Sequence, residues 1–355
     1  MRRSPRPSPP ARASPTGPRP RQSGPAPGPE RNTVNTPVSS KPRPEEPTNR
    51  RHAAKRTRRL ATLATVGAAA LALTACTPGG PPVAALDNGD QGEITIAVFA
   101  GWPEGIAVSQ LWSAVLEDEG YDVTLTDVDV APGYSGVASG DYDLVMDSWL
   151  PNTHADYVDR FGDDMTDLGA WYTEARNTIV VNEDAPITSL DELAANADLF
   201  GNTIVGLEPG AGLTQITEEQ AIPTYGLESM DFVTSSTAAL LTELQARTDA
   251  GENVVATLAR PHWAYDAYPI RDLEDPEGAM GPAEEIHSMA SSTFDEDFAT
   301  ASDWLRDFEL SEDDLLSLCN VMFNENGGAE GTDYEPIVRA WMDEHPDVVE
   351  ALTGA

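Results

Sequence analysis

Lysine is absent from residues 77 to 355 of this sequence, and the 7 basic residues of that span are all arginine. The same span contains 56 acidic residues, so its surface carries a large negative charge. A surface of that sign repels the phosphates of nucleic acids and of anionic lipids. The composition therefore argues against nucleic-acid binding and electrostatic docking on membranes, and it is compatible with a cationic ligand. We attribute most of the charge to solubility, so it does not identify the ligand.

Cysteine is equally scarce, because the chain has only Cys76 and Cys319 and therefore no disulfide framework. Cys319 lies in an apolar helical pattern that predicts a buried free thiol. Catalytic motifs of the types Gly-x-Ser-x-Gly, His-Glu-x-x-His and Cys-x-x-Cys are missing, and His154, His262 and His287 lack metal-ligand spacing. We expect a protein that is not an enzyme and needs no cofactor or metal. An enzyme that uses His154 or His262 is the less favoured alternative, and a structural lipoprotein is disfavoured because the sequence has no repeats.

The N-terminal part of the chain differs in character from the rest. Residues 1–49 are rich in Pro, Arg, Ser and Gly and poor in apolar side chains, which predicts a disordered extension. A basic cluster and a short apolar run follow, ending in Leu73-Thr74-Ala75-Cys76, which resembles a bacterial lipobox. We expect residues 50–75 to be a lipoprotein signal peptide, Cys76 to be lipidated, and residues 76–92 to be a tether. The mature protein would then be anchored by lipid on the extracytoplasmic face of the cell membrane. A signal peptide this far into the sequence suggests a translation start further downstream.

Strand and helix patterns alternate after the tether. Residues 93–99, 121–128 and 144–148 are β-branched or apolar runs. Apolar residues with helical spacing follow the first run, and a short helix is expected after the second. The alternation begins again after Arg176, which predicts a second α/β set. We therefore predict an α/β fold of two lobes that resembles a type II periplasmic binding protein, with a ligand cleft between the lobes and two chain crossovers. The first lobe would contain residues 92–176 and 264–355, and the second lobe residues 177–263.

Three aromatic residues of the first lobe, Trp102, Tyr134 and Trp149, occupy predicted strand-to-helix turns. An isolated Trp is more often part of a core than of a site. These three, however, meet at one edge of one sheet, where open α/β sheets bind ligands. The faces of such rings attract cations. The convergence therefore favours an aromatic cage.

An anionic group on the same ligand would need donors. Gly105 and Ile106 lie at a predicted helix start, where backbone N–H groups can bind a carboxylate. The loop 209–212 could donate from the second lobe, but an ordinary glycine-rich turn explains it equally well.

Five segments between residues 92 and 345 carry a family resemblance: Gly101-Trp102, Ser148 to His154, Gly206 to Gly212, Pro261-His262-Trp263, and Leu273 to Pro276 followed by Gly281. In these segments and in their order, the sequence resembles the periplasmic or lipid-anchored substrate-binding proteins of glycine betaine, proline betaine and choline ABC importers. The resemblance implies a two-lobed fold that closes on a quaternary ammonium ligand in a cage of Trp and Tyr rings. It also implies delivery to a membrane permease driven by a separate ATPase.

One departure from the family concerns the second lobe. Family members usually carry Trp-x-Pro-His, whereas this sequence has Ala259 in place of that Trp. Either Trp263 or Tyr172 replaces the missing ring, or the ligand differs. Arg260 beside the gap could pair with a carboxylate, so we predict a betaine-like zwitterion in preference to choline; carnitine and ectoine remain alternatives. The residues expected at the ligand are Trp102, Glu104, Gly105, Ile106, Tyr134, Trp149, Arg260, His262 and Trp263.

Overall fold

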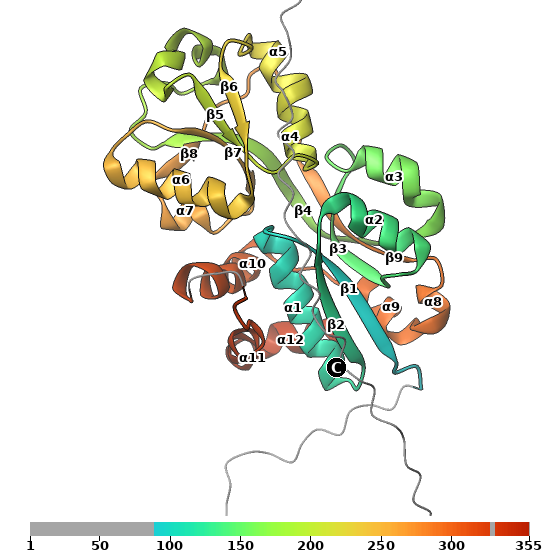
Figure 1. Ribbon diagram of the computed structural model, residues 1–355. Coiled ribbons are helices and arrows are strands. Elements are labelled where there is room, and N and C mark those ends of the chain that lie inside the picture. Colours follow the sequence, from blue (N-terminus) through green and yellow to red (C-terminus); the bar gives the residue numbers. More distant parts are fainter. Residues whose placement is uncertain (1–88, 327–330, 355) are drawn as a thin grey trace, which may run out of the picture. The chain divides into compact units, whose positions relative to one another are not determined.

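The computed structural model describes residues 89–326 and 331–354 (Figure 1). The predicted disordered extension, the signal peptide, Cys76 and most of the tether lie outside the described residues. Among the described residues, no helix combines the length and the apolar character needed to cross a membrane.

The strands are short apart from one. Their bounds are β1 (Glu93–Phe99), β2 (Asp122–Val128), β3 (Leu144–Leu150), β4 (Met165–Asn182), β5 (Thr203–Gly206), β6 (Asp231–Thr234), β7 (Val255–Arg260), β8 (Ile270–Asp272) and β9 (Glu284–Ser291). The helices are α1 (Pro103–Asp118), α2 (Val130–Ser139), α3 (Ala155–Phe161), α4 (Gly212–Ile216), α5 (Ile222–Tyr225), α6 (Thr237–Ala250), α7 (Ala264–Ala267), α8 (Phe294–Asp297), α9 (Ala299–Arg306), α10 (Glu312–Cys319), α11 (Glu335–Glu344) and α12 (Pro346–Thr353).

Local sequence explains several of these boundaries. Pro103 occupies the first position of α1, where its fixed φ suits a helix and its missing N–H costs nothing. The hydroxyls of Ser236 and Ser311 accept backbone N–H groups at the starts of α6 and α10. Ser189 and Glu192 form a capping box, and the segments that follow it to Phe200 are 3₁₀ helices.

The strands follow the order β2-β1-β3-β9-β4-β7-β5-β6, with β8 also paired to β4. The 18-residue β4 contributes to two sheets, one with β9 in the first lobe and one with β7 and β8 in the second. Both sheets contain parallel and antiparallel strands. β1 is parallel to β2 and β3, and β5 is parallel to β6 and β7, whereas β4 and β9 pair antiparallel with all their neighbours.

The return of the chain to the first lobe comes later than the residue 264 at which we placed it. β8 pairs with β4 within the sheet of the second lobe, and Ser189 forms a bridge to Glu274. The chain rejoins the sheet of the first lobe at β9. A three-residue strand such as β8 has too little periodicity to be recognised in a sequence.

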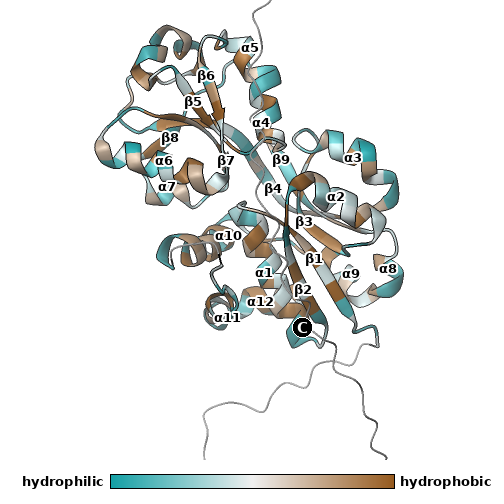
Figure 2. Cartoon of the chain, viewed as in Figure 1, coloured by the Kyte–Doolittle hydropathy of each residue, from teal (hydrophilic) through white to brown (hydrophobic). Residues whose placement is uncertain are grey.

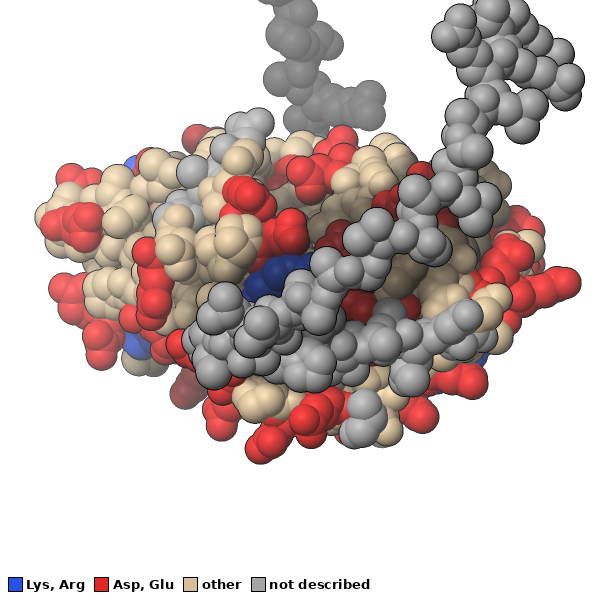
Figure 3. All heavy atoms as spheres, turned by 90° about the horizontal axis from the view of Figure 1, so that it is seen from below, with Lys and Arg blue, Asp and Glu red and all other residues tan. Residues whose placement is uncertain are grey.

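The core of the first lobe contains two tryptophans that lie on helices. Trp112 is fully buried against Phe308, with ring centroids 5.3 Å apart, and Trp341 is 3% exposed. Trp304 is only partly buried. Most residues of β1 and β3 are hydrophobic (Figure 2). Acidic side chains outnumber basic ones on the face shown in Figure 3. Cys319 is a buried free thiol, as predicted.

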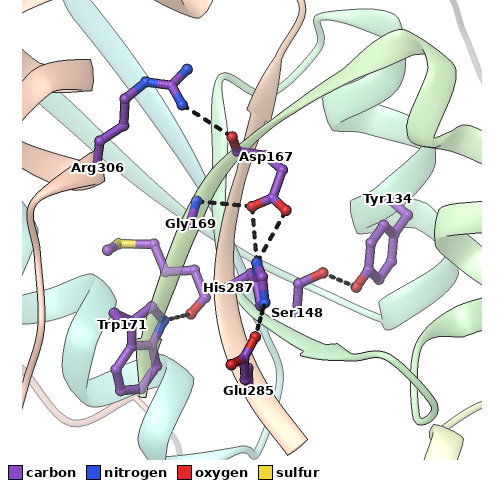
Figure 4. Close-up of polar contacts among 9 residues, drawn as sticks. Tyr134, Ser148, Asp167, Gly169, Trp171, Glu285, His287 and Arg306 are labelled. Carbon is purple, nitrogen blue, oxygen red and sulfur yellow. Dashed lines mark hydrogen bonds and ion pairs between the residues drawn. The ribbon is translucent and has the colours of Figure 1, made fainter. Parts of the chain in front are cut away.

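His287 on β9 links the two strands that connect the lobes (Figure 4). Its Nδ1 lies 2.9 Å from Oδ1 of Asp167 on β4, and its Nε2 lies 3.3 Å from Oε2 of Glu285. Burial disfavours the charged ring, but the hydrogen bond and charge of Asp167, with help from Glu285, outweigh burial and raise the pKa of His287. The same contact contributes to a lowered pKa of Asp167, against the opposing effect of burial.

This ion pair predicts a pH-dependent contribution to stability. A raised pKa of His287 in the folded state means that the contribution is complete below about pH 6.5 and is lost as the pH rises through the raised value. It is lost at the acid end as the pH falls through the lowered pKa of Asp167. Because both carboxylates are about half exposed, the contribution should be on the order of 1 kcal/mol. The free energy of unfolding of His287→Gln, measured with urea from pH 5 to 9, should lack this pH-dependent contribution. Asp167→Asn should lack it too, and a wild-type pH profile in His287→Gln would contradict the assignment.

Candidate ligand-binding site

One pocket, with a cavity volume of about 40 Å³, draws its walls from both lobes. Of the predicted site residues, the structure brings together Trp102, Glu104, Trp149 and His262, and Ala259 lies beside them. The complete lining, called the ligand pocket below, is Trp102, Pro103, Glu104, Trp149, Thr153, His154, Asn177, Leu207, Ala211, Leu213, Thr237, Leu258, Ala259 and His262.

Trp102 forms one wall of the ligand pocket. It directly precedes α1, after a turn in which Gly101 adopts a φ of +87° that favours glycine. The indole is 8% exposed and lies parallel to the ring of His154, with centroids 5.5 Å apart. Its Nε1–H donates to Oε1 of Glu208 at 2.7 Å. The ring is therefore held on one face and at its polar edge.

Trp149 forms a second wall at the end of β3. It is 3% exposed, and its Nε1–H donates to Oδ1 of Asp147 at 2.9 Å. The two residues are two positions apart on a strand, so their side chains leave the same face of the sheet. Trp149 thus combines a place in the pocket with a hydrogen bond to a buried carboxyl.

Two buried histidines line the ligand pocket as neutral rings. Nδ1 of His154 accepts the backbone N–H of Trp149 at 2.9 Å, and Nδ1 of His262 accepts that of Ala264 at 3.0 Å. Burial lowers the pKa of each ring to about 3. A neutral imidazole whose Nδ1 is an acceptor carries its proton on Nε2. Within the described residues neither Nε2 has a hydrogen-bond partner, so each ring offers an unused N–H donor.

Glu104 and Asp147 form a buried acidic pair beside the tryptophans. Glu104 is 5% exposed and Asp147 is 1% exposed, and Oδ2 of Asp147 has no partner among the described residues. Burial raises the pKa of Asp147 to about 7. Burial first, and then the neighbouring charge of Asp147, raise the pKa of Glu104 well above its ordinary value. The pair therefore holds protons more tightly than exposed carboxyls do.

Gly105 explains how the acidic pair fits against α1. A Cβ atom at this position would lie 2.3 Å from Oδ2 of Asp147, so only glycine permits the approach. Gly105 does not line the pocket. The N–H of Ile106 donates to the carbonyl of Trp102 at 3.0 Å, closing the first helical turn. The prediction that Ile106 offers a free donor to the ligand was therefore wrong.

Tyr134 lies behind the wall of the ligand pocket and does not line it. Its ring is fully buried and stacks on Tyr157, with centroids 5.0 Å apart, and its edge meets His154. Its hydroxyl bonds to the hydroxyl of Ser148 (Figure 4). We expected Tyr134 to be a cage wall, whereas it supports the ring of His154 from behind.

Arg260 points away from the ligand pocket, contrary to our expectation. Its Nε donates to Oδ2 of Asp272 at 2.7 Å, and its guanidinium lies 3.6 Å from the ring centroid of Tyr265. Successive side chains on a strand leave opposite faces, so Ala259 on β7 faces the pocket and Arg260 does not.

Neither ring proposed to fill the gap at Ala259 lines the ligand pocket. Trp263 packs behind His262 at 5.6 Å between centroids and meets Tyr268 with its edge. Tyr172 on β4 packs against Trp171. The second lobe therefore presents aliphatic surface here, from Leu258 and Ala259.

Sequence reasoning missed several lining residues. Thr237 lies just after the end of β6, and we selected Trp102 because it follows a strand in the same way. The sequence therefore contained a signal for Thr237. Asn177 lies on β4, and its Nδ2–H donates to the hydroxyl of Thr153 at 2.6 Å. Glu284 accepts the N–H and hydroxyl of Thr153 and holds the loop before α3 in place. Among the residues that the structure describes, no group of three or more His, Cys, Asp or Glu side chains could hold a metal ion.

A family model described as the substrate binding domain of ABC-type glycine betaine transport systems matches residues 92–344. The chain is 32% identical over 171 residues to the glycine betaine/carnitine transport binding protein GbuC of Listeria monocytogenes, covering 47% of this chain and 55% of that protein. It is 29% identical over 180 residues to the glycine betaine-binding periplasmic protein OusX of Dickeya dadantii, covering 46% and 54%. The chain thus spans about half the length of these curated relatives.

Solved structures share the fold. A glycine betaine/L-proline-binding protein (ProX) from Borrelia burgdorferi matches with a TM-score of 0.68 and 28% identity, covering 73% of this chain and 96% of that one. Lactococcal OpuAC, crystallised closed on glycine betaine, matches with a TM-score of 0.67 and 25% identity, covering 74% and 100%. These similarities confirm the predicted two-lobed α/β fold.

The bond between Trp149 and Asp147 predicts a specific cost of removing the indole N–H. Trp149→Phe keeps an aromatic wall but leaves a buried carboxyl without its donor, which should lower the free energy of unfolding by about 1–3 kcal/mol beyond the loss of packing. Trp112→Phe is the matched control, because Trp112 is fully buried and its Nε1–H has no partner in the described part of the chain. Denaturant unfolding of both variants measures the difference. Equal losses would show that the bond to Asp147 contributes nothing.

Proposed function

Because the chain belongs to the family of substrate-binding domains of ABC-type glycine betaine transport systems, we propose that it captures a quaternary ammonium compound such as glycine betaine. It acts outside the cytoplasm as the binding component of an importer and delivers the solute to a permease driven by a separate ATPase. The proposed anchor is lipid on Cys76, a residue that lies outside the described part of the chain.

The ammonium end of the ligand has a suitable environment. Trp102 and Trp149 offer two indole walls, and each ring face contributes about 0.5–2 kcal/mol to binding a cation. Among the described residues that line the pocket, Glu104 alone becomes negatively charged when it loses its proton, and none is Lys or Arg. A bound cation would favour that loss, because it stabilises the ionised carboxyl.

The carboxylate end has a donor in the opposite lobe. Nε2–H of His262 is buried and has no partner among the described residues. A ligand carboxylate would supply the missing acceptor and would remove the cost of leaving that donor unpaired. The observation that carries the proposal is this combination, within one pocket, of indole walls, an acidic group and an unused imidazole N–H.

Two alternatives have less support. Choline is the second candidate, because Glu104 favours a ligand with net positive charge. An enzyme that uses His154 or His262 is less favoured, because both rings are held neutral with Nδ1 bonded to the backbone, an arrangement that suits donation of a hydrogen bond better than proton transfer.

Calorimetric titration with a pair of ligands that match in shape and differ in charge tests the proposal. Glycine betaine should bind, and 3,3-dimethylbutyrate, which replaces the ammonium nitrogen with carbon, should bind about fivefold to a thousandfold more weakly, since two ring faces lose a cation. Choline should bind more weakly than glycine betaine, because it offers His262 no carboxylate.

Two variants serve as controls for this titration. Glu104→Gln should weaken binding of glycine betaine and leave binding of 3,3-dimethylbutyrate unchanged. His262→Phe should reduce the preference for glycine betaine over choline. Equal affinity for glycine betaine and its carbon analogue would contradict recognition of the cation, and no binding of any quaternary amine would refute the proposed function.

A further inference from the structure

We propose that Glu208 is a positioning residue that fixes the wall formed by Trp102 and couples ligand capture to the approach of the two lobes. The proposal rests on the proposed function and adds to it a residue that does not line the ligand pocket. Glu208 lies in the loop after β5 of the second lobe, whereas Trp102 belongs to the first lobe.

The carboxylate of Glu208 joins three donors. Its Oε1 accepts Nε1–H of Trp102 at 2.7 Å, and its Oε2 accepts both the backbone N–H and the hydroxyl of Thr237 at 3.2 Å. Thr237 is the first residue of α6 and itself lines the pocket. One side chain therefore ties a wall of the first lobe to a helix start of the second.

Packing at Gly101 brings the same elements together. A Cβ atom on this residue would lie 3.2 Å from Cβ of Thr237, so the turn before Trp102 rests directly against the start of α6. The bond to Glu208 thus forms at a point where the lobes touch, and it requires them to touch.

Two physical consequences follow from this geometry. A hydrogen bond from a neutral N–H to a carboxylate is stronger than one between neutral groups, so it fixes the indole angle relative to the ligand. The bond also exists only when the lobes lie in contact. Any state in which the lobes separate loses it, so ligand binding and lobe approach stabilise each other through Trp102.

The test is a double-mutant cycle between Glu208→Ala and Trp102→Phe, with affinity for glycine betaine as the measurement. Glu208→Ala should weaken binding about tenfold to a hundredfold in the wild-type background. It should have little further effect on Trp102→Phe, which keeps a ring but has no N–H for Glu208 to accept. Additive effects of the two substitutions would overturn the proposal.

Kinetics distinguishes positioning from a general loss of stability. Stopped-flow fluorescence should show that Glu208→Ala raises the dissociation rate of glycine betaine and changes the association rate little, because the bond stabilises the lobes in contact. Glu243→Ala is the matched control, since Glu243 is a carboxylate of the same lobe that pairs with Arg247 on the surface of α6. Similar dissociation rates for the two variants would contradict the proposal.

A ligand-free measurement separates this proposal from the proposed function. In the free protein the indole N–H resonance of Trp102 should move upfield in Glu208→Ala in proportion to the fraction of molecules whose lobes lie in contact, and it should stay in place in Glu243→Ala. If wild-type protein bound no quaternary amine, the proposed function would fail, and this resonance would still decide whether Glu208 holds Trp102. An unchanged resonance in Glu208→Ala would overturn the positioning role.

Discussion

The buried carboxyl of Asp147 fixes the positions of the residues that form the first-lobe side of the ligand pocket. It receives the indole N–H of Trp149 at 2.9 Å, and it lies so close to Gly105 that no larger residue fits there. Trp102 directly precedes α1 and Glu104 lies in its first turn, and this start of the helix packs closely against the end of β3. Both tryptophan walls depend on this contact, so the pocket is assembled around a group that is costly to bury.

That cost has an electrostatic consequence. Asp147 and Glu104 have raised pKa values in the folded protein, so folding becomes less favourable as the pH rises from the ordinary range of carboxyls through those values. A cation bound against the indoles would stabilise the ionised forms and offset the loss. The two buried carboxyls therefore reduce the stability of the first lobe, and a ligand of the proposed charge would offset this loss. Perturbed pKa values of this kind are common at binding sites.

The sequence predicts some parts of this arrangement because simple geometry dictates them. Trp102 follows β1, and Trp149 lies near the end of β3. The two strands are parallel, so their ends meet at one edge of the sheet, and both tryptophans line the pocket. Arg260 was assigned wrongly, although the alternation of side chains along β7 already placed it opposite Ala259. Tyr134 shows a different limit of prediction from sequence. A helical pattern does not tell whether a ring lines a pocket or packs behind a residue that lines it.

Contacts between distant segments set the remaining limit. The bond from Trp102 to Glu208 joins residues 106 positions apart, and no local pattern records it. The three-residue β8, which keeps the chain in the second lobe beyond residue 264, is too short to show periodicity. The two-lobed architecture follows from repeated local signals, whereas the details of the site depend on how the lobes meet.

A crystal structure of the complex with glycine betaine tests the central claim most directly. The account predicts the ammonium nitrogen within about 6 Å of the ring centroids of Trp102 and Trp149. It also predicts the ligand carboxylate at hydrogen-bond distance from Nε2 of His262. A ligand bound with its carboxylate against the indoles, or bound outside this pocket, would contradict it.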